Sequence, residues 1–244
     1  MIRTTTVVVI ASALLLSAAP ARADTYGEEL NSVGNPDLAK KKKSGPNDSG
    51  LQLGLRTGFG LPLGKPWDTP GDMAGDVRGI IPVWIDAGYR INPSIYVGAY
   101  GSLGFAIMNT SSNPACSSGG SCSATDIRFG VDAHYHFSPG EDFDPWVGLG
   151  VGYEFWNLKL GIPNTLTYSR KLKGFEFLDL QVGGDMKVAT DVAVGPFVSF
   201  SLGQFSHAKV TSSTAAGTSV QDDDIKNTAM HYWLMLGLRG AFNL

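Results

Sequence analysis

The sequence has no apolar run long enough for a transmembrane helix. The longest run, residues 7–19, falls short of the ~20 residues that a helix needs to cross a bilayer. The formal net charge is only −3, which argues against a nucleic acid as partner. Mean hydropathy is +0.01, close to neutral. These features exclude a helical membrane protein, but they are compatible with strands whose apolar and polar residues alternate.

The N-terminus has the features of a secretory signal peptide. Arg3 gives a positive start, an apolar run follows, and Ala21-Arg22-Ala23 forms a cleavage site of the A-x-A type. We predict a signal peptide over residues 1–23 in preference to a single membrane anchor. The polar residues 24–49 are expected to form a flexible periplasmic segment. Its basic run, residues 40–43, is interpreted as a solvated linker, with an anionic partner as the alternative.

Cysteine is scarce, and its context favours a disulfide. The only two cysteines, Cys116 and Cys122, flank the short stretch Ser-Ser-Gly-Gly-Ser. A metal site would need histidine or further cysteine nearby, and this segment contains neither. In an exported protein the two thiols would meet an oxidising compartment, so we predict a disulfide between them. We predict no bound metal and no cofactor.

Strict alternation of apolar and polar residues runs through much of the chain. In residues 126–137, Phe129 and Val131 belong to the apolar face, while Arg128 and Asp132 belong to the other. A period of two is typical of a β-strand with one apolar face. Pro196 interrupts the seventh segment and predicts a bulge there. Eight segments are predicted as strands: 50–63, 79–91, 94–106, 126–137, 147–155, 178–187, 192–202 and 232–244.

The spacing of these segments predicts a transmembrane barrel. They come in pairs joined by short turns, and long polar loops, among them residues 157–173 and 205–228, separate the pairs. Full charges on one face suit a polar lumen, and the apolar face suits lipid. We therefore predict an all-β, eight-stranded, antiparallel up-and-down barrel over residues 50–244, with short periplasmic turns and long extracellular loops. A soluble lipocalin-like barrel, with the opposite polarity, is the alternative.

The alternation places a set of charged side chains in the lumen. Buried charges are tolerated when they are paired and hydrogen-bonded, and an eight-stranded barrel has room for little beyond its own side chains. We predict a lumen filled by a salt-bridge network in preference to an ion or solute path, with Trp84, Trp146, Trp156 and Trp233 narrowing it further. The charged set is Arg56, Asp86, Arg90, Asp126, Arg128, Asp132, Glu154, Asp179, Asp185, Lys187 and Arg239.

Histidine raises the possibility of an enzyme. His136-Phe137-Ser138 contains two members of a hydrolase triad, but the sequence ties no acid to them. We predict no catalytic residues and keep a lipid-modifying enzyme as the less favoured alternative. His207 and His231 lie near the last long loop and are predicted to be solvated.

Two segments carry a resemblance to a known group. Residues 144–154 (Asp-Pro-Trp-Val-Gly-Leu-Gly-Val-Gly-Tyr-Glu) and 88–91 (Gly-Tyr-Arg-Ile) resemble the small outer-membrane β-barrel superfamily, which includes outer-membrane protein A-like single-domain barrels. The final segment, with Phe242 and Leu244, resembles the C-terminal signal read by the barrel assembly machinery. The resemblance implies location in the cell outer membrane, contact with its lipid and binding to that machinery.

The resemblance carries no single function, because one fold hosts many. We predict a monomeric barrel of structural or surface-interaction type, and the loop partner is unknown. The alternative is a small-solute channel or transporter.

Overall fold

The computed structural model describes residues 49–244 except for 69–70, 112–115, 117–119 and 164. The predicted signal peptide and nearly all of the predicted periplasmic segment lie outside these residues. No helix in the described part is long and apolar enough to cross a membrane. The elements are β1 (Gly50–Gly64), α1 (Met73–Asp76), β2 (Val77–Asn92), β3 (Ile95–Met108), β4 (Ser121–His136), β5 (Phe143–Ile162), β6 (Leu166–Ala189), β7 (Val192–Thr214), β8 (Gly217–Asp224) and β9 (Met230–Asn243).

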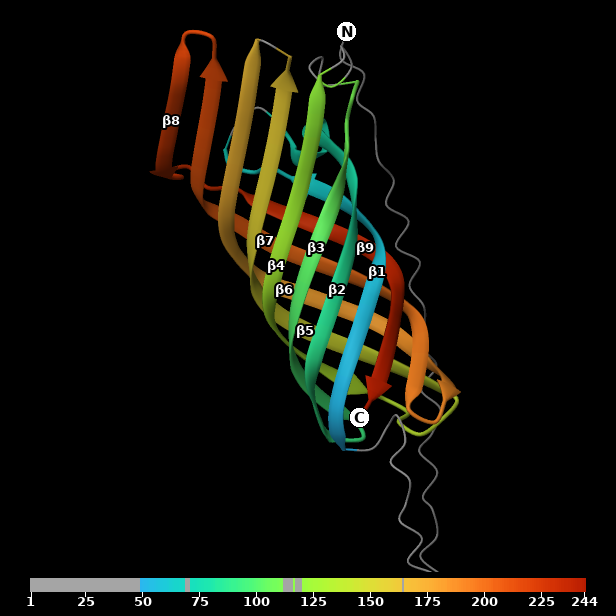
Figure 1. The fold of residues 1–244 in the computed structure, drawn as a ribbon. Helices are drawn as coiled ribbons and strands as arrows, with labels where there is room; N and C mark the ends of the chain where they lie inside the picture. Colours follow the sequence, from blue (N-terminus) through green and yellow to red (C-terminus); the bar gives the residue numbers. More distant parts are fainter. Residues whose placement is uncertain (1–48, 69–70, 112–115, 117–119, 164) are drawn as a thin grey trace, which may run out of the picture. The chain divides into compact units, whose positions relative to one another are not determined.

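Eight of these strands close into an antiparallel ring. Neighbours in the chain pair from β1 to β7, β7 pairs with β9, and β9 returns to β1, from Gln52↔Asn243 to Gly64↔His231. The predicted eight-stranded barrel is therefore confirmed (Figure 1). The ninth strand, β8, pairs with the end of β7 and stands outside the ring.

The prediction was wrong where it placed the last two long loops. Residues 157–173 lie mostly in β5 and β6, and residues 205–228 contain the end of β7 and all of β8. Polar side chains occupy most of both segments, so the short apolar alternation of Leu158, Leu160 and Ile162 was not enough to predict strands there. There the end of β5, the start of β6 and the end of β7 form, with β8 and the start of β4, a sheet beyond the last β7–β9 pair, Gln204↔Met230 (Figure 1). We call it the projecting sheet.

The bulge predicted at Pro196 is absent, and bulges occur elsewhere. Pro196 lies opposite Leu238 in an uninterrupted register. The register of β6 instead shifts by one residue at Phe177 relative to both β5 and β7. A second shift, on β7, makes Ser206 an extra residue opposite β6. Each extra residue moves the following side chains to the other face of the sheet.

Polarity in the barrel is the reverse of that in a soluble protein. Leu236 and Ile85 are 63% and 62% exposed, whereas the lumen residues Arg56 and Glu154 are each 1% exposed. Burying ion pairs while leaving large apolar side chains outside is favourable only if lipid covers the outer surface. The outer band is therefore the surface that a transmembrane barrel presents to lipid.

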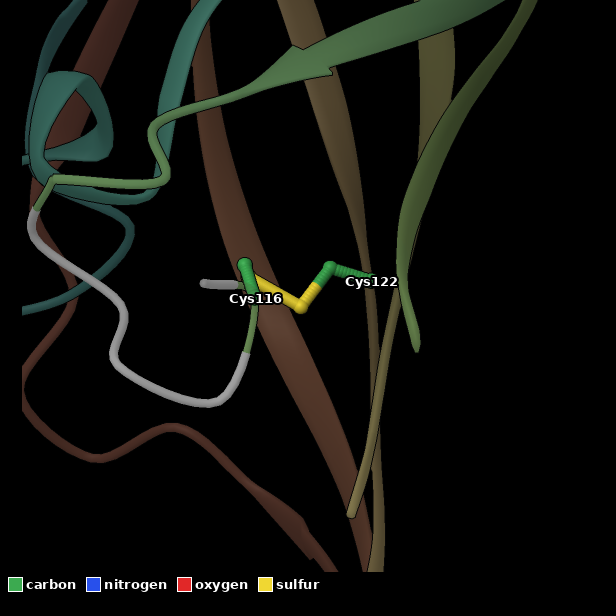
Figure 2. The surroundings of a disulfide bond; sticks show 2 residues. All are labelled: Cys116 and Cys122. Carbon is green, nitrogen blue, oxygen red and sulfur yellow. A yellow bond between two sulfur atoms is a disulfide. The ribbon is translucent and has the colours of Figure 1, made fainter. Parts of the chain in front are cut away.

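The predicted disulfide is confirmed. Cys116 and Cys122 are bonded at the long-loop end, with Cα atoms 5.4 Å apart. Cys122 belongs to β4, and Cys116 belongs to the segment between β3 and β4 (Figure 2). The bond links Cys116 to the start of β4.

Candidate functional site in the barrel interior

The centre of the lumen is organised around Arg56 on β1. Its Nε donates to Asp86 Oδ2 at 2.9 Å, and its two terminal nitrogens contact Asp86 and Gln181, the latter at 2.6 Å. Asp132 lies 3.5 Å away. The guanidinium also stacks over Trp84, 4.9 Å from the ring centroid. A cation from one wall is thus held by groups from three other strands.

Asp179 joins the same group indirectly. It accepts a hydrogen bond of 2.6 Å from Gln181 Nε2. This chain of contacts crosses the lumen from β1 to β6, so side chains occupy the centre of the tube.

A second cluster surrounds Arg128 on β4, nearer the long loops. Its Nε donates to Asp126 at 2.7 Å, and a terminal nitrogen donates to Glu176 at 3.2 Å and Ser201 at 3.1 Å. Glu154 lies 3.7 Å from the other terminal nitrogen. Three carboxylates therefore surround one guanidinium, which lies 5.0 Å from the Trp233 ring centroid.

Neutral donors and a histidine complete this cluster. Tyr100 donates to Glu176 at 2.6 Å, and Trp233 Nε1 donates to Glu154 at 3.1 Å. His231 Nε2 is 2.6 Å from the other oxygen of Glu154. The prediction that His231 is solvated was therefore wrong, because β9 begins at Met230 and carries His231 into the lumen.

A third cluster lies toward the short turns. Arg239 forms an ion pair with Asp185 and lies 4.8 Å from the Trp146 ring centroid. Trp146 Nε1 donates to the other oxygen of Asp185 at 3.0 Å. The carboxylate and the indole thus hold the guanidinium from two sides.

Two histidines line the same end of the lumen. His136 Nδ1 is 2.8 Å from Asp144, and its Nε2 is 3.2 Å from Arg90. His134 Nε2 is 3.1 Å from Asp132. The acid beside His136, which the sequence could not supply, is therefore Asp144. However, the Ser138 contact with Asp144 is made by its backbone N–H, so these bonds do not pair a hydroxyl with a base.

The structure thus buries ten of the eleven charged residues expected in the lumen. Lys187 is the exception, and its prediction was wrong. It lies opposite Ala193 two residues before β6 ends, and its side chain is exposed. At the rim a long lysine side chain can keep its ammonium group in water.

Glu176 was missed for a physical reason. Alternation counted back from Asp179 gives Glu176 the outer face. The extra residue Phe177 reverses that count, so Glu176 and Asp179 both lie inside. The sequence carries a signal for this bulge, because the adjacent apolar residues Phe177 and Leu178 interrupt the alternation between Glu176 and Asp179.

An apolar layer lies at the long-loop end of the lumen. Trp156 and Trp233 lie 5.8 Å apart between ring centroids. They belong to a buried apolar cluster whose members come from α1, from β2 to β7 and from β9, and the half-buried Trp67 packs against it. The members on this side include Met73, Leu158, Leu172 and Phe205.

Within the described residues, no group of three or more histidine, cysteine or acidic side chains could hold a metal ion.

Solved outer-membrane barrels share this fold. A major outer membrane protein from Thermus thermophilus is 13% identical over 80% of this chain and 99% of that chain, with a TM-score of 0.54. OprG from Pseudomonas aeruginosa is 13% identical over 82% and 99%, and Neisserial surface protein A is 15% identical over 80% and 98%, each with a TM-score of 0.48. No protein-family model and no curated protein matches the sequence. The chain therefore has the fold of the small outer-membrane β-barrels, and its apolar outer band agrees with a location in the outer membrane.

Proposed function

We propose that the protein is a monomeric, non-enzymatic outer-membrane barrel with a closed lumen, which anchors the projecting sheet at the cell surface for interaction with a partner. The observation that carries this proposal is the filling of the tube. Three lumen arginines form ion pairs with carboxylates on other strands, and each also stacks on an indole ring: Arg56, Arg128 and Arg239. Such groups leave an eight-stranded barrel little space for a solute.

The length of the strands supports the surface role. β6 and β7 have 24 and 23 residues, well above the 9–11 residues (roughly) that span a bilayer. Their extra length forms the projecting sheet with the exposed strand β8. An antiparallel sheet rooted in a rigid barrel is a suitable scaffold for recognition.

The C-terminal strand suggests a further binding partner. β9 closes the barrel against β1, Phe242 is on its outer face, and Leu244, which follows the strand, is exposed. We propose that the barrel assembly machinery recognises this strand before closure.

Conductance in planar bilayers tests the closed lumen. The wild type should give no steady current. The double variant Trp156→Ala/Trp233→Ala opens the apolar layer and serves as the control for detecting a leak. Steady conductance of the wild type, with ion selectivity altered by Glu154→Gln, would instead establish the alternative function of a small-solute channel.

A further inference from the structure

A basic cluster lies on the outer wall at the base of the projecting sheet. We call Lys171, Lys173, His207 and Lys209 the basic patch. Lys171 lies directly opposite Lys209, and Lys173 directly opposite His207, across the β6–β7 ladder. The extra residue Ser206 produces this arrangement, because it moves His207 and Lys209 to the outer face.

The cations of the patch are only partly compensated. Lys209 Nζ and His207 Nε2 each lie 2.7 Å from Asp222, and His207 Nδ1 lies 2.8 Å from Asp224. Lys171 and Lys173 form no ion pair with any residue that the structure describes. Like charges directly opposite each other destabilise a sheet. Asp222 compensates Lys209, so Lys171 and Lys173 are the two cations of the patch that an external anion would stabilise.

A recess with a volume of about 240 Å³ lies within this patch. Its lining comprises the four patch residues together with Phe155, Asn157, Leu172 and Asp222. A recess of this size, lined by several ammonium groups, can accommodate a phosphate group.

An apolar groove begins beside the recess. Phe155 lines both and lies directly opposite Lys173. The groove has a volume of about 610 Å³. It coincides with the bulge at Phe177, which breaks the regular outer surface of β5 and β6. Its walls are mostly apolar, with Phe129, Val131, Val151, Tyr153, Phe175 and Phe177 among them.

Along the outer wall, the cationic side chains of the recess are followed by aromatic side chains and then by the aliphatic side chains of the groove. Tyr153 contacts both Phe155 and Phe175, with ring centroids 5.1 and 5.0 Å apart. Aromatic residues of this kind mark the headgroup level of a bilayer. The basic patch thus lies just above the interface on the long-loop side.

We propose that the basic patch and the adjoining groove bind a phosphorylated membrane lipid, with its phosphate on Lys171 and Lys173 and an acyl chain along the groove. A phosphate supplies the negative charge that Lys171 and Lys173 lack, and it does so at the level of the headgroups. The acyl chain covers aromatic surface that already faces lipid. This inference rests on the proposed membrane embedding and is independent of whether the lumen is closed.

Native mass spectrometry of the detergent-solubilised barrel with diphosphoryl lipid A tests the proposal. Replacing both lysines in Lys171→Gln/Lys173→Gln should weaken binding by about 10-fold, since two charge-assisted contacts are lost. Lys171→Arg/Lys173→Arg keeps the charge and should bind like the wild type. Lys187→Gln removes one charge at the opposite rim and should also leave binding unchanged. Each variant should retain heat-modifiable gel mobility, which shows that the barrel is folded.

Two further probes identify the ligand. Lipid A stripped of both phosphates should bind more weakly than the diphosphoryl form, and equal binding would overturn the role of the lysines. Inorganic phosphate should not displace lipid A at equal concentration, and displacement would show a simple ion site in place of a lipid site. Unchanged binding by the double glutamine variant would also overturn the proposal. A conducting wild type that still bound lipid A would refute only the closed lumen.

Discussion

Removing Asp185 should destabilise the barrel more than removing any exposed acid. Asp185 is the only acid within 4.0 Å of an Arg239 side-chain nitrogen among the described residues, and the two side chains are 5% and 1% exposed. In Asp185→Ala the guanidinium keeps its contact with Trp146 but has no carboxylate. Breaking a buried pair by removing one partner costs about 3–5 kcal/mol.

The matched variants separate the lost pair from lost packing. Arg239→Met should also be costly, because Asp185 then keeps only the Trp146 N–H as a donor. Arg239→Met/Asp185→Leu replaces both charges with apolar groups, and its cost should be well below the sum of the single changes. Asp191→Ala, in the exposed turn before β7, should stay within about 0.5 kcal/mol of the wild type.

Urea unfolding of the barrel in lipid vesicles, followed by tryptophan fluorescence, measures these free energies. If Asp185→Ala unfolds within about 0.5 kcal/mol of the wild type, the carboxylate does not hold Arg239 as the structure indicates. Additive costs in the double variant would refute the coupling between the two residues.

Three further predictions concern other parts of the molecule. Val131→Arg on the lipid-facing wall should cost about 2–4 kcal/mol, whereas Thr218→Arg on β8 should be neutral; equal unfolding free energies would refute the assigned orientation of β4. Replacing both cysteines with serine should lower stability by about 2 kcal/mol and leave the barrel folded, and alkylation followed by mass spectrometry should find no free thiol in the native wild type. Hydrogen bonds to Asp224 and Asp222 raise the pKa of His207, although Lys173 opposes this shift, so His207 stabilises the β7–β8 hairpin below its ordinary pKa and this contribution is lost as the pH rises through the raised value. Amide exchange in β8, corrected for intrinsic rates, should therefore quicken across that range, and His207→Gln should abolish the change.

The sequence alone was sufficient for the barrel, because each wall strand has two environments and must alternate between them. Arg56, Asp86 and Glu154 could be assigned to the lumen by counting residues, and apolar neighbours along the chain, such as Leu55 and Ile85, to the lipid. The short turns after Asn92 and Ala189 fixed the end at which pairs of strands are joined. The fold class thus depended on a local period that needs no knowledge of distant contacts.

Other features depended on register, which is a relation between strands. The extra residues Phe177 and Ser206 moved Glu176 into the lumen and His207 onto the outer wall. The adjacent apolar residues Phe177 and Leu178 mark the first position in the sequence, whereas no comparable signal marks Ser206. The projecting sheet was also hidden, because its mostly polar strands carry only a short apolar alternation.

Pairing within the lumen was likewise decided only by tertiary structure. Composition showed that cations and acids nearly balance, but not that Arg239 would meet Asp185 or that His231 would meet Glu154. Those choices depend on how eight strands stagger around the ring, which sets the height of each side chain along the tube. The sequence determined the inward face of most lumen residues, and the closure of the barrel determined which of them meet.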